Sequence, residues 1–173
     1  MTRHSLTIHA PLVLVLALAG APALADPVGD GPPGTRIVGP WRVTITPVDC
    51  TTGEAFTAFA FKSQLTFGAG GTLAETNASR GFQPDQRSPG HGYWEYTGRE
   101  TYRAYFEAFI RFDSVDPLPP ARPYQRGVQS VDQSIEMRGS NGWVSDALVI
   151  FRDAAGEIVP PSGCATAAAE RMR

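Results

Sequence analysis

Residues 92–113 read GYWEYTGRETYRAYFEAFIRFD, and this stretch decides the fold class. Two runs rich in aromatic residues flank residues 97–100, and a short connection that contains glycine is typical of a β-hairpin. In the second run, every second residue is apolar. Because side chains alternate between the two faces of a strand, this period of two predicts a strand with one buried face. Its apolar residues are Tyr102, Ala104, Phe106, Ala108, Ile110 and Phe112.

The opposite face of this strand carries charged residues. Arg103, Glu107 and Arg111 fall between the apolar positions. If this face lined an interior, a carboxylate between two guanidinium groups would stay ionised and could orient a polar ligand, which makes the three residues candidate catalytic residues. If it faces water, they form weak surface pairs, each contributing about 0–1 kcal/mol. We expect the apolar face to be buried and the charged face to be solvated.

The first 25 residues have the organisation of a secretory signal peptide. Arg3 precedes an apolar run over residues 11–19, which is too short to span a bilayer, and Ala23 and Ala25 are the small residues that signal peptidase requires. We therefore expect cleavage between Ala25 and Asp26 and release into the periplasm or outside the cell. No second apolar run follows, so the sequence predicts no integral membrane segment.

Cleavage would leave 148 of the 173 residues, which suits a single domain. Residues 26–35 lack an apolar pattern and predict a flexible lead-in, so the domain would comprise residues 36–173. The loss of Arg3 leaves 14 basic residues against 17 acidic ones, with no basic cluster. This balance excludes a nucleic-acid-binding role.

Cys50 and Cys164 are the only cysteines, and both lie after the expected cleavage site. In an oxidising compartment we predict that they form a disulfide between the end of the first strand and the C-terminal segment. The chain-entropy model gives such a bridge about 4–5 kcal/mol of stabilisation, less any strain in the folded state. Two unrelated buried thiols are the alternative.

Strands recur along the chain at roughly even spacing. Seven or eight antiparallel strands must either close or split into two layers to protect their edges. We predict an all-β, up-and-down barrel, with a β-sandwich as the alternative. The alanine-rich segment 164–173 is predicted to be a short helix, because its basic end suits the negative pole of a helix dipole. Besides the hairpin, alternating patterns predict a first strand that starts at residue 41 and ends around residues 47–50, and further strands at residues 55–67, 72–76, 128–138, 143–152 and 157–159.

The head of the first strand resembles that of a lipocalin. Gly39, Pro40 and Trp41 form the Gly-x-Trp pattern that opens lipocalin barrels, and the size, signal peptide and late disulfide are similar to those of the family. The resemblance is to small secreted bacterial proteins of this calycin-type shape, and it implies no particular ligand. It does imply that Trp41 closes one end of the barrel, beneath an arginine from the last strand. Arg152, at the end of the strand over residues 143–152, is the position that we match to this arginine.

Few residues suit nucleophilic or metal chemistry. His91 is the one histidine after the cleavage site, and it lies between two glycines in a setting too loose for a Ser-His-Asp site. A zinc site would need more histidines or cysteines outside the predicted bridge. We predict no metal and no cofactor.

The interior of the barrel is predicted to be either filled or hollow. Ala104 and Ala108 interrupt the large residues of the central strand, and Ala58 and Ala60 do so in the second strand. Such small residues either make room for large ones across a dense core or leave a hydrophobic cavity. The candidates for lining a cavity are Phe59, Phe61, Tyr102, Phe106 and Ile110.

Three functions stay open on these patterns. We prefer a secreted, lipocalin-like protein that binds a small apolar or amphipathic ligand. The alternatives are an enzyme of the barrel-cyclase or isomerase kind that acts on a lipid-like substrate, and a structural or interaction module with a solid core. The enzyme would need a polar residue deep in an apolar lumen, for which Glu107, Glu95 and Glu136 are the candidates. A dry cavity would favour the binding protein, and a cavity with one buried carboxylate would favour the enzyme.

Overall fold

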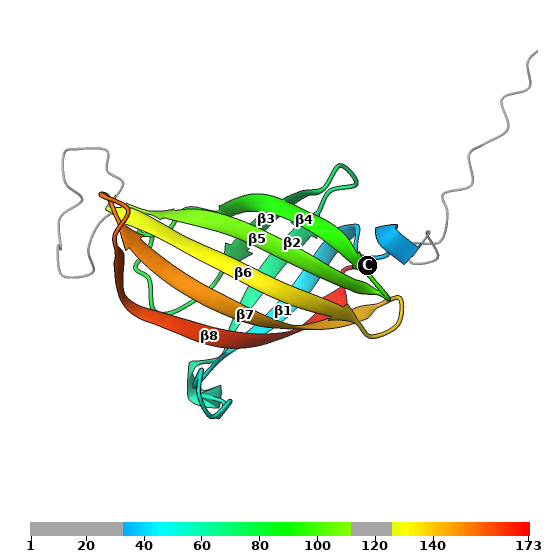
Figure 1. Cartoon of the computed structure of the whole chain (residues 1–173), viewed down its shortest axis with the longest axis horizontal. Helices are drawn as coiled ribbons and strands as arrows, with labels where there is room; N and C mark the ends of the chain where they lie inside the picture. Colours follow the sequence, from blue (N-terminus) through cyan, green and yellow to red (C-terminus); the bar gives the residue numbers. More distant parts are fainter. Residues whose placement is uncertain (1–32, 112–125) are drawn as a thin grey trace, which may run out of the picture.

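Eight antiparallel strands close into one barrel in the computed structural model of the chain, which describes residues 33–111 and 126–173 (Figure 1). Each strand pairs with the next along the chain, and β1 pairs with β8 to complete the ring. The prediction of an all-β, up-and-down barrel is therefore confirmed, with eight strands, and the sandwich alternative is wrong. The strands are β1 (Gly39–Val48), β2 (Phe61–Phe67), β3 (Thr72–Asn77), β4 (Gly90–Gly98), β5 (Thr101–Ile110), β6 (Gly127–Met137), β7 (Gly142–Asp153) and β8 (Ile158–Arg171).

The apolar face of β5 points into the barrel, as its alternation predicts. Tyr102 and Phe106 are buried, whereas Arg103 and Glu107 are exposed. The register places Phe106 opposite Val131 of β6, so that the inner faces of the two strands coincide. The sequence pattern of β5 therefore fixes which side of the sheet becomes the interior.

One end of the barrel is filled with aromatic side chains; we call it the closed end. It is the end at which β1 begins and β8 finishes. Trp41, Phe67, Tyr102 and Trp143 are each at most 1% exposed. The ring centroids of Trp41 and Trp143 lie 6.1 Å apart, and those of Phe67 and Trp143 lie 6.2 Å apart, both in edge-to-face geometry. Such contacts add to the free energy gained by burial, and the four rings fill this end of the barrel.

Arg171 of β8 covers the closed end. Its guanidinium carbon lies 4.2 Å from the centroid of the Trp41 ring, and its nitrogens donate to the carbonyl oxygens of Ser140 at 3.1 Å and Val38 at 2.8 Å. A cation over a tryptophan face is stabilising, and the carbonyl oxygens replace the water that burial removes. Burial still lowers the pKa of Arg171 from its ordinary value.

The prediction that Arg152 covers Trp41 is wrong. Arg152 lies at the opposite end of β7 from Trp143, and its guanidinium donates to the carbonyl oxygen of Gly156 at 3.2 Å. The arginine over Trp41 does come from the last strand, as the resemblance implies, but that strand is β8 and not β7.

The predicted C-terminal helix over residues 164–173 is also wrong, because β8 runs through most of it. The strand pairs with β1 from Trp41 opposite Arg171 to Val48 opposite Cys164, and with β7 on its other side. A register shift between Val149 and Phe151 of β7 lets β8 pass through Pro160, which cannot donate a ladder hydrogen bond. Pairing of β8 with a strand on each side outweighs the preference of alanine for a helix, which is worth roughly a few tenths of a kcal/mol per residue.

The predicted disulfide is confirmed. Cys50 and Cys164 are bonded, with Cα atoms 5.2 Å apart and a sequence separation of 114 residues. Cys164 lies opposite Val48 in the ladder between β1 and β8, and Cys50 follows β1 directly. The bridge therefore ties the seam at which the first and last strands close the ring.

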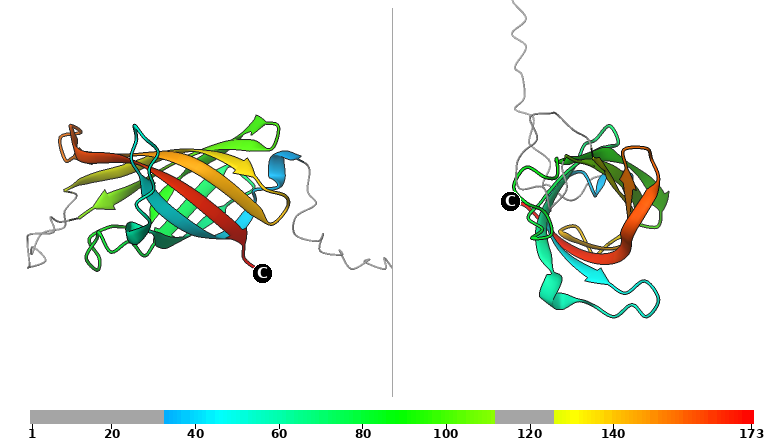
Figure 2. Two further views of the ribbon diagram at one scale, coloured as in Figure 1. Left: turned by 90° about the horizontal axis from the view of Figure 1, so that it is seen from below. Right: turned by 90° about the vertical axis from the view of Figure 1, so that its left-hand side faces the viewer.

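The connection between β1 and β2 extends away from the barrel (Figure 2). It contains a 3-10 turn, η2 (Thr57–Phe59), and β2 begins only at Phe61. Phe59 is 72% exposed, and Ala58 and Ala60 are exposed as well. The second strand is thus shorter than predicted, and these three residues do not face the interior.

The expected signal peptide lies outside the described residues, as does most of the predicted lead-in. Residues 33–35 of that lead-in form a 3-10 turn, η1 (Pro33–Thr35), at the closed end (Figure 1). Within the described ranges, the structure has no helix with the length and apolar character needed to cross a membrane.

Candidate functional site

The half of the barrel away from the closed end holds a cavity of approximately 790 Å³. We call this half the open end; it is where β7 finishes and β8 begins, and Figure 2 shows the ring of strands from this side. The cavity volume lies within the range of about 300–1,000 Å³ found for small-molecule sites. Its wall is mainly apolar, with contributions from Val43, Ile45, Phe61, Leu65, Phe106, Val131, Val149 and Phe151.

Small residues of β7 and β8 leave the space open. Ala147, Ala165 and Ala167 all line the cavity, and they lie on two adjacent strands, with Ala147 opposite Ala165. Each alanine contributes only a methyl group to the lumen, whereas other strands contribute phenylalanine and isoleucine side chains. The hollow interior is therefore present, but the alanines that create it belong largely to the segment that the sequence predicts as helix.

The five predicted lining residues divide into three groups. Phe61, Phe106 and Ile110 do line the cavity. Tyr102 is buried in the closed end instead, where burial raises the pKa of its phenol and keeps it neutral. Phe59 lies outside the barrel. The central hairpin and β2 thus supply part of the wall, as predicted.

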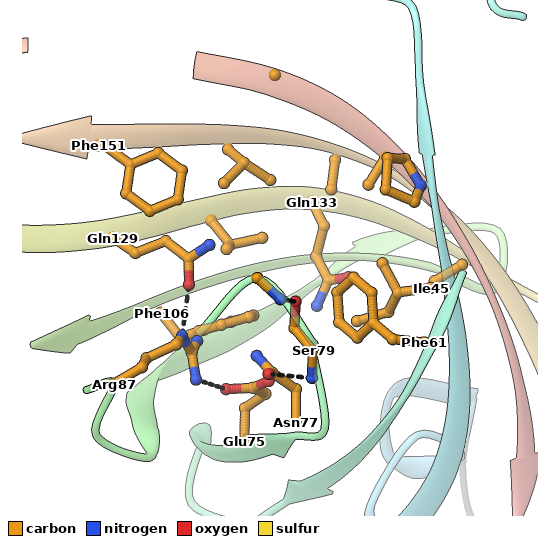
Figure 3. Close-up of a pocket in the computed structure, with 18 of the residues that line it drawn as sticks. Ile45, Phe61, Glu75, Asn77, Ser79, Arg87, Phe106, Gln129, Gln133 and Phe151 are labelled. Atoms are coloured by element: carbon orange, nitrogen blue, oxygen red, sulfur yellow. Dashed lines mark hydrogen bonds and ion pairs between the residues drawn. The ribbon is translucent and has the colours of Figure 1, made fainter. Parts of the chain in front are cut away.

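A buried ion pair lies in the cavity wall. Arg87 Nη1 and Glu75 Oε2 are 2.8 Å apart, with side chains 5% and 1% exposed (Figure 3). The two atoms are close enough for an ion pair, but Oε2 is buried and accepts no hydrogen bond from the described residues.

The two members of the pair reach the lumen in different ways. Glu75 follows the alternation of β3, in which Leu73 and Glu75 are buried. Its carboxylate fits because Gly90, opposite it in β4, has no side chain: a Cβ there would lie 2.9 Å from Oε2. Arg87 lies between β3 and β4, where an isolated bridge to Ile110 holds the backbone against the end of β5.

Neutral polar groups complete the network around the ion pair. Arg87 Nε donates to Gln129 Oε1 of β6 at 2.5 Å, and Ser63 Oγ lies 3.1 Å from Glu75 Oε1. A buried pair of charges is tolerated when hydrogen bonds satisfy the remaining polar atoms. The network gives one side of an apolar cavity a polar surface with no net charge.

The charged face of β5 lies outside the barrel. Arg103 makes a bidentate contact with Asp132 of β6, with N–O distances of 2.6 and 3.0 Å, and this guanidinium holds the pKa of the Asp132 carboxyl below its usual range. Glu107 is exposed and accepts a hydrogen bond from the Tyr105 hydroxyl. Arg111 is exposed as well. The charged face of β5 is therefore solvated, as expected, and the alternative in which Arg103, Glu107 and Arg111 form a catalytic group inside the barrel is wrong.

The other candidate carboxylates are also excluded from the lumen. Glu95 and Glu136 are exposed on the outer faces of β4 and β6. The carboxylate that does face the cavity is Glu75, which sequence reasoning missed. A signal was present, since Glu75 shares a face with Leu73 in a six-residue strand. No comparable signal existed for Arg87, which lies in an irregular connection.

No metal site is present in the part of the chain that the structure describes, where no group of three or more histidine, cysteine, aspartate or glutamate residues could hold an ion. His91 is exposed on β4. The chemistry of the cavity therefore rests on the Glu75–Arg87 pair and on neutral amide and hydroxyl groups.

Comparison with known proteins identifies no family. No family model matches the chain, and no curated protein matches it in sequence. Among solved structures, it is similar to a chain described as EF1p2_mFAP2b bound to DFHBI, with 16% sequence identity and a TM-score of 0.49 over 80% of this chain and 95% of that one.

Proposed function

We propose that the protein is a secreted, lipocalin-like binding protein that holds one small, largely apolar molecule in the lumen of its barrel. The observation that carries the proposal is the cavity of approximately 790 Å³, with apolar walls and a few polar groups gathered on one side. This is the usual composition of a small-molecule site. The disulfide between Cys50 and Cys164 supports an oxidising compartment.

Filling the cavity should weaken binding. The double variant Ala147→Phe/Ala167→Phe places two rings in the lumen from adjacent strands. We expect it to bind the fluorescent apolar probe N-phenyl-1-naphthylamine at least about tenfold more weakly than the wild type, because the ring volume competes with the probe. The measurement is a fluorescence titration of protein with its disulfide intact.

The matched control changes the next residue on each strand. Leu148 and Ala168 are exposed on the outer face, so Leu148→Phe/Ala168→Phe adds the same rings outside the barrel. This control should bind the probe as the wild type does, with circular dichroism confirming that both variants are folded. Equal affinities for all three proteins would place the probe outside the lumen and contradict the proposal.

A second function is favoured by one observation, the buried carboxylate of Glu75 beside Arg87 in an apolar cavity. An enzyme that isomerises or cyclises a lipid-like substrate would need such a group, because an ionised carboxylate can stabilise a cation or accept a proton in a site that excludes water.

The binding function and the enzyme function predict different molecules purified with the Glu75→Gln variant. For an enzyme, a molecule purified with the variant should be an isomer of the one purified with the wild type, because the reaction stops at the substrate. For a binding protein, both should retain the same compound. Native mass spectrometry, followed by chromatography of the released molecules, separates the outcomes, and the exposed-site change Glu136→Gln serves as the control.

A further inference from the structure

The cavity contains an amide donor that the protein leaves unused. Gln133 of β6 is 5% exposed, and Figure 3 shows its side chain reaching into the cavity toward Phe61 and Ile45. Its Oε1 accepts a hydrogen bond from Ser145 Oγ at 3.2 Å, whereas its Nε2 has no acceptor among the described residues. Buried amide groups are nearly always paired, so this one requires an explanation.

A second unused donor belongs to the same cavity. Trp143 is 1% exposed and lines the cavity where it meets the closed end, and its Nε1 also lacks an acceptor in the described ranges. The other two tryptophans differ in this respect. Trp41 Nε1 donates to the carbonyl oxygen of Ile37 at 2.7 Å, and Trp94 Nε1 donates to that of Gly68 at 2.9 Å. The fold thus pairs the indole N–H groups of Trp41 and Trp94, whereas the buried N–H of Trp143, a cavity-lining residue, has no acceptor among the described residues.

The indole group settles which kind of partner the deep cavity accepts. The amide of Gln133 can present either its nitrogen or its oxygen to the lumen, because the Ser145 hydroxyl can both donate and accept. Trp143 can only donate. Two donors without acceptors call for a molecule that carries an acceptor.

The charge of the cavity wall further restricts the class of ligand. Among the described residues that line it, Glu75 and Arg87 are the charged ones, and they neutralise each other at 2.8 Å. A carboxylate taken into this lumen would lose its hydration and gain no unpaired cation in return. A neutral acceptor avoids that cost.

We infer that the ligand is a neutral, mainly apolar molecule with a carbonyl-type acceptor, such as a ketone, aldehyde, ester or lactone, which binds at the deep end against Gln133 and Trp143. This inference rests on the proposed binding function and names the ligand class for the same cavity.

Three naphthalene probes with one shared body test the inference. The ketone 6-propionyl-2-(dimethylamino)naphthalene carries a neutral acceptor, 2-(dimethylamino)naphthalene lacks it, and 6-(dimethylamino)-2-naphthoate carries a charge. In fluorescence titrations with the wild type, the ketone should bind about fivefold to tenfold more tightly than the parent amine, which is the effect of one hydrogen bond to a buried donor. The carboxylate should bind most weakly.

Two variants assign the effect to the proposed donors. Gln133→Leu should remove most of the preference for the ketone over the amine, and Trp143→Phe, which keeps a ring at the closed end, should reduce it. The ketone emission reports hydrogen bonding to its carbonyl, so it should shift to shorter wavelength in Gln133→Leu. Gln64→Leu, on the exposed face of β2, is the matched control and should leave the preference and the emission unchanged.

The outcomes separate this inference from the function on which it rests. The ligand class is wrong if the ketone and the amine bind equally well, or if the carboxylate binds most tightly. The binding function still stands in that case, provided that Ala147→Phe/Ala167→Phe weakens the binding of the probes. A ketone preference that survives both Gln133→Leu and Trp143→Phe would also overturn the inference. If none of the three naphthalene probes binds, and Ala147→Phe/Ala167→Phe binds N-phenyl-1-naphthylamine as the wild type does, the binding function itself is wrong.

Discussion

Arg87→Met should lower the free energy of unfolding by about 3–5 kcal/mol, because it leaves the Glu75 carboxylate buried without its cation. The arginine is 5% exposed and the carboxylate 1%, so solvent does little to screen the loss. The change also removes the donor to Gln129 Oε1. Urea denaturation followed by circular dichroism measures the effect, which should appear as a lower midpoint with an unchanged slope.

A double variant tests whether the loss comes from an unpaired charge. Glu75→Gln/Arg87→Met removes both charges and keeps a hydrogen-bonding partner for Ser63, so it should recover most of the lost stability. Arg138→Met is the exposed control, since Arg138 pairs with Glu136 at 2.7 Å with side chains 59% and 52% exposed, and it should cost at most about 1 kcal/mol. If Arg87→Met costs no more than Arg138→Met, the buried pair does not stabilise the barrel as described.

Loss of the disulfide should cost about 4–5 kcal/mol, because the bridge closes a loop of more than a hundred residues. Cys50→Ala/Cys164→Ala removes it without leaving free thiols. The position of the bridge predicts where the barrel opens first. Without it, the open end of the ladder between β1 and β8 loses its covalent link.

Hydrogen exchange locates that opening. Amides of β1 near Val48 and of β8 near Cys164 should lose the most protection in the double alanine variant, while amides near Trp41 and Arg171 should lose no more than the drop in global stability, since the closed end is packed independently of the bridge. Uniformly faster exchange along both strands would show that the bridge stabilises the whole fold and does not act locally at the seam.

The sequence predicts most of the barrel because its strands alternate cleanly. In β5, large apolar and charged side chains succeed one another, so only one orientation buries the apolar set. The pairing of two cysteines in a chain that has no others is equally well determined. Both features can be predicted from a single sequence, because they depend on the alternation of neighbouring residues and on the number of cysteines.

The last strand could not be read in the same way. Residues 164–169 are mostly small, so neither an alternation nor a clear hydrophobic face marks them as a strand, and alanine favours helices in isolation. What holds them in β8 is pairing with β1 and β7, both far away in sequence. The error over Arg152 followed from this one, since the true last strand ends at Arg171.

The candidate site was predicted in its apolar part and missed in its polar part. Phe61, Phe106 and Ile110 follow from strand alternation and do line the cavity. Glu107 was the more conspicuous carboxylate because two arginines flank it, but the same pattern that buries Phe106 turns it outward. Arg87 reaches the lumen from an irregular connection, where side-chain direction depends on tertiary contacts that no period reveals.

The pairing of β1 with β8 brings both strand ends together at the closed end, where the Met172 amide donates to the carbonyl oxygen of Pro40 at 3.1 Å (Figure 1). The cavity lies in the other half of the barrel. A molecule anchored to a sensor surface through its C-terminus, or fused there to a reporter domain, would therefore carry the cavity in the half of the barrel away from the attachment point. If the proposed binding function holds, affinities measured on such immobilised protein should equal those measured free in solution.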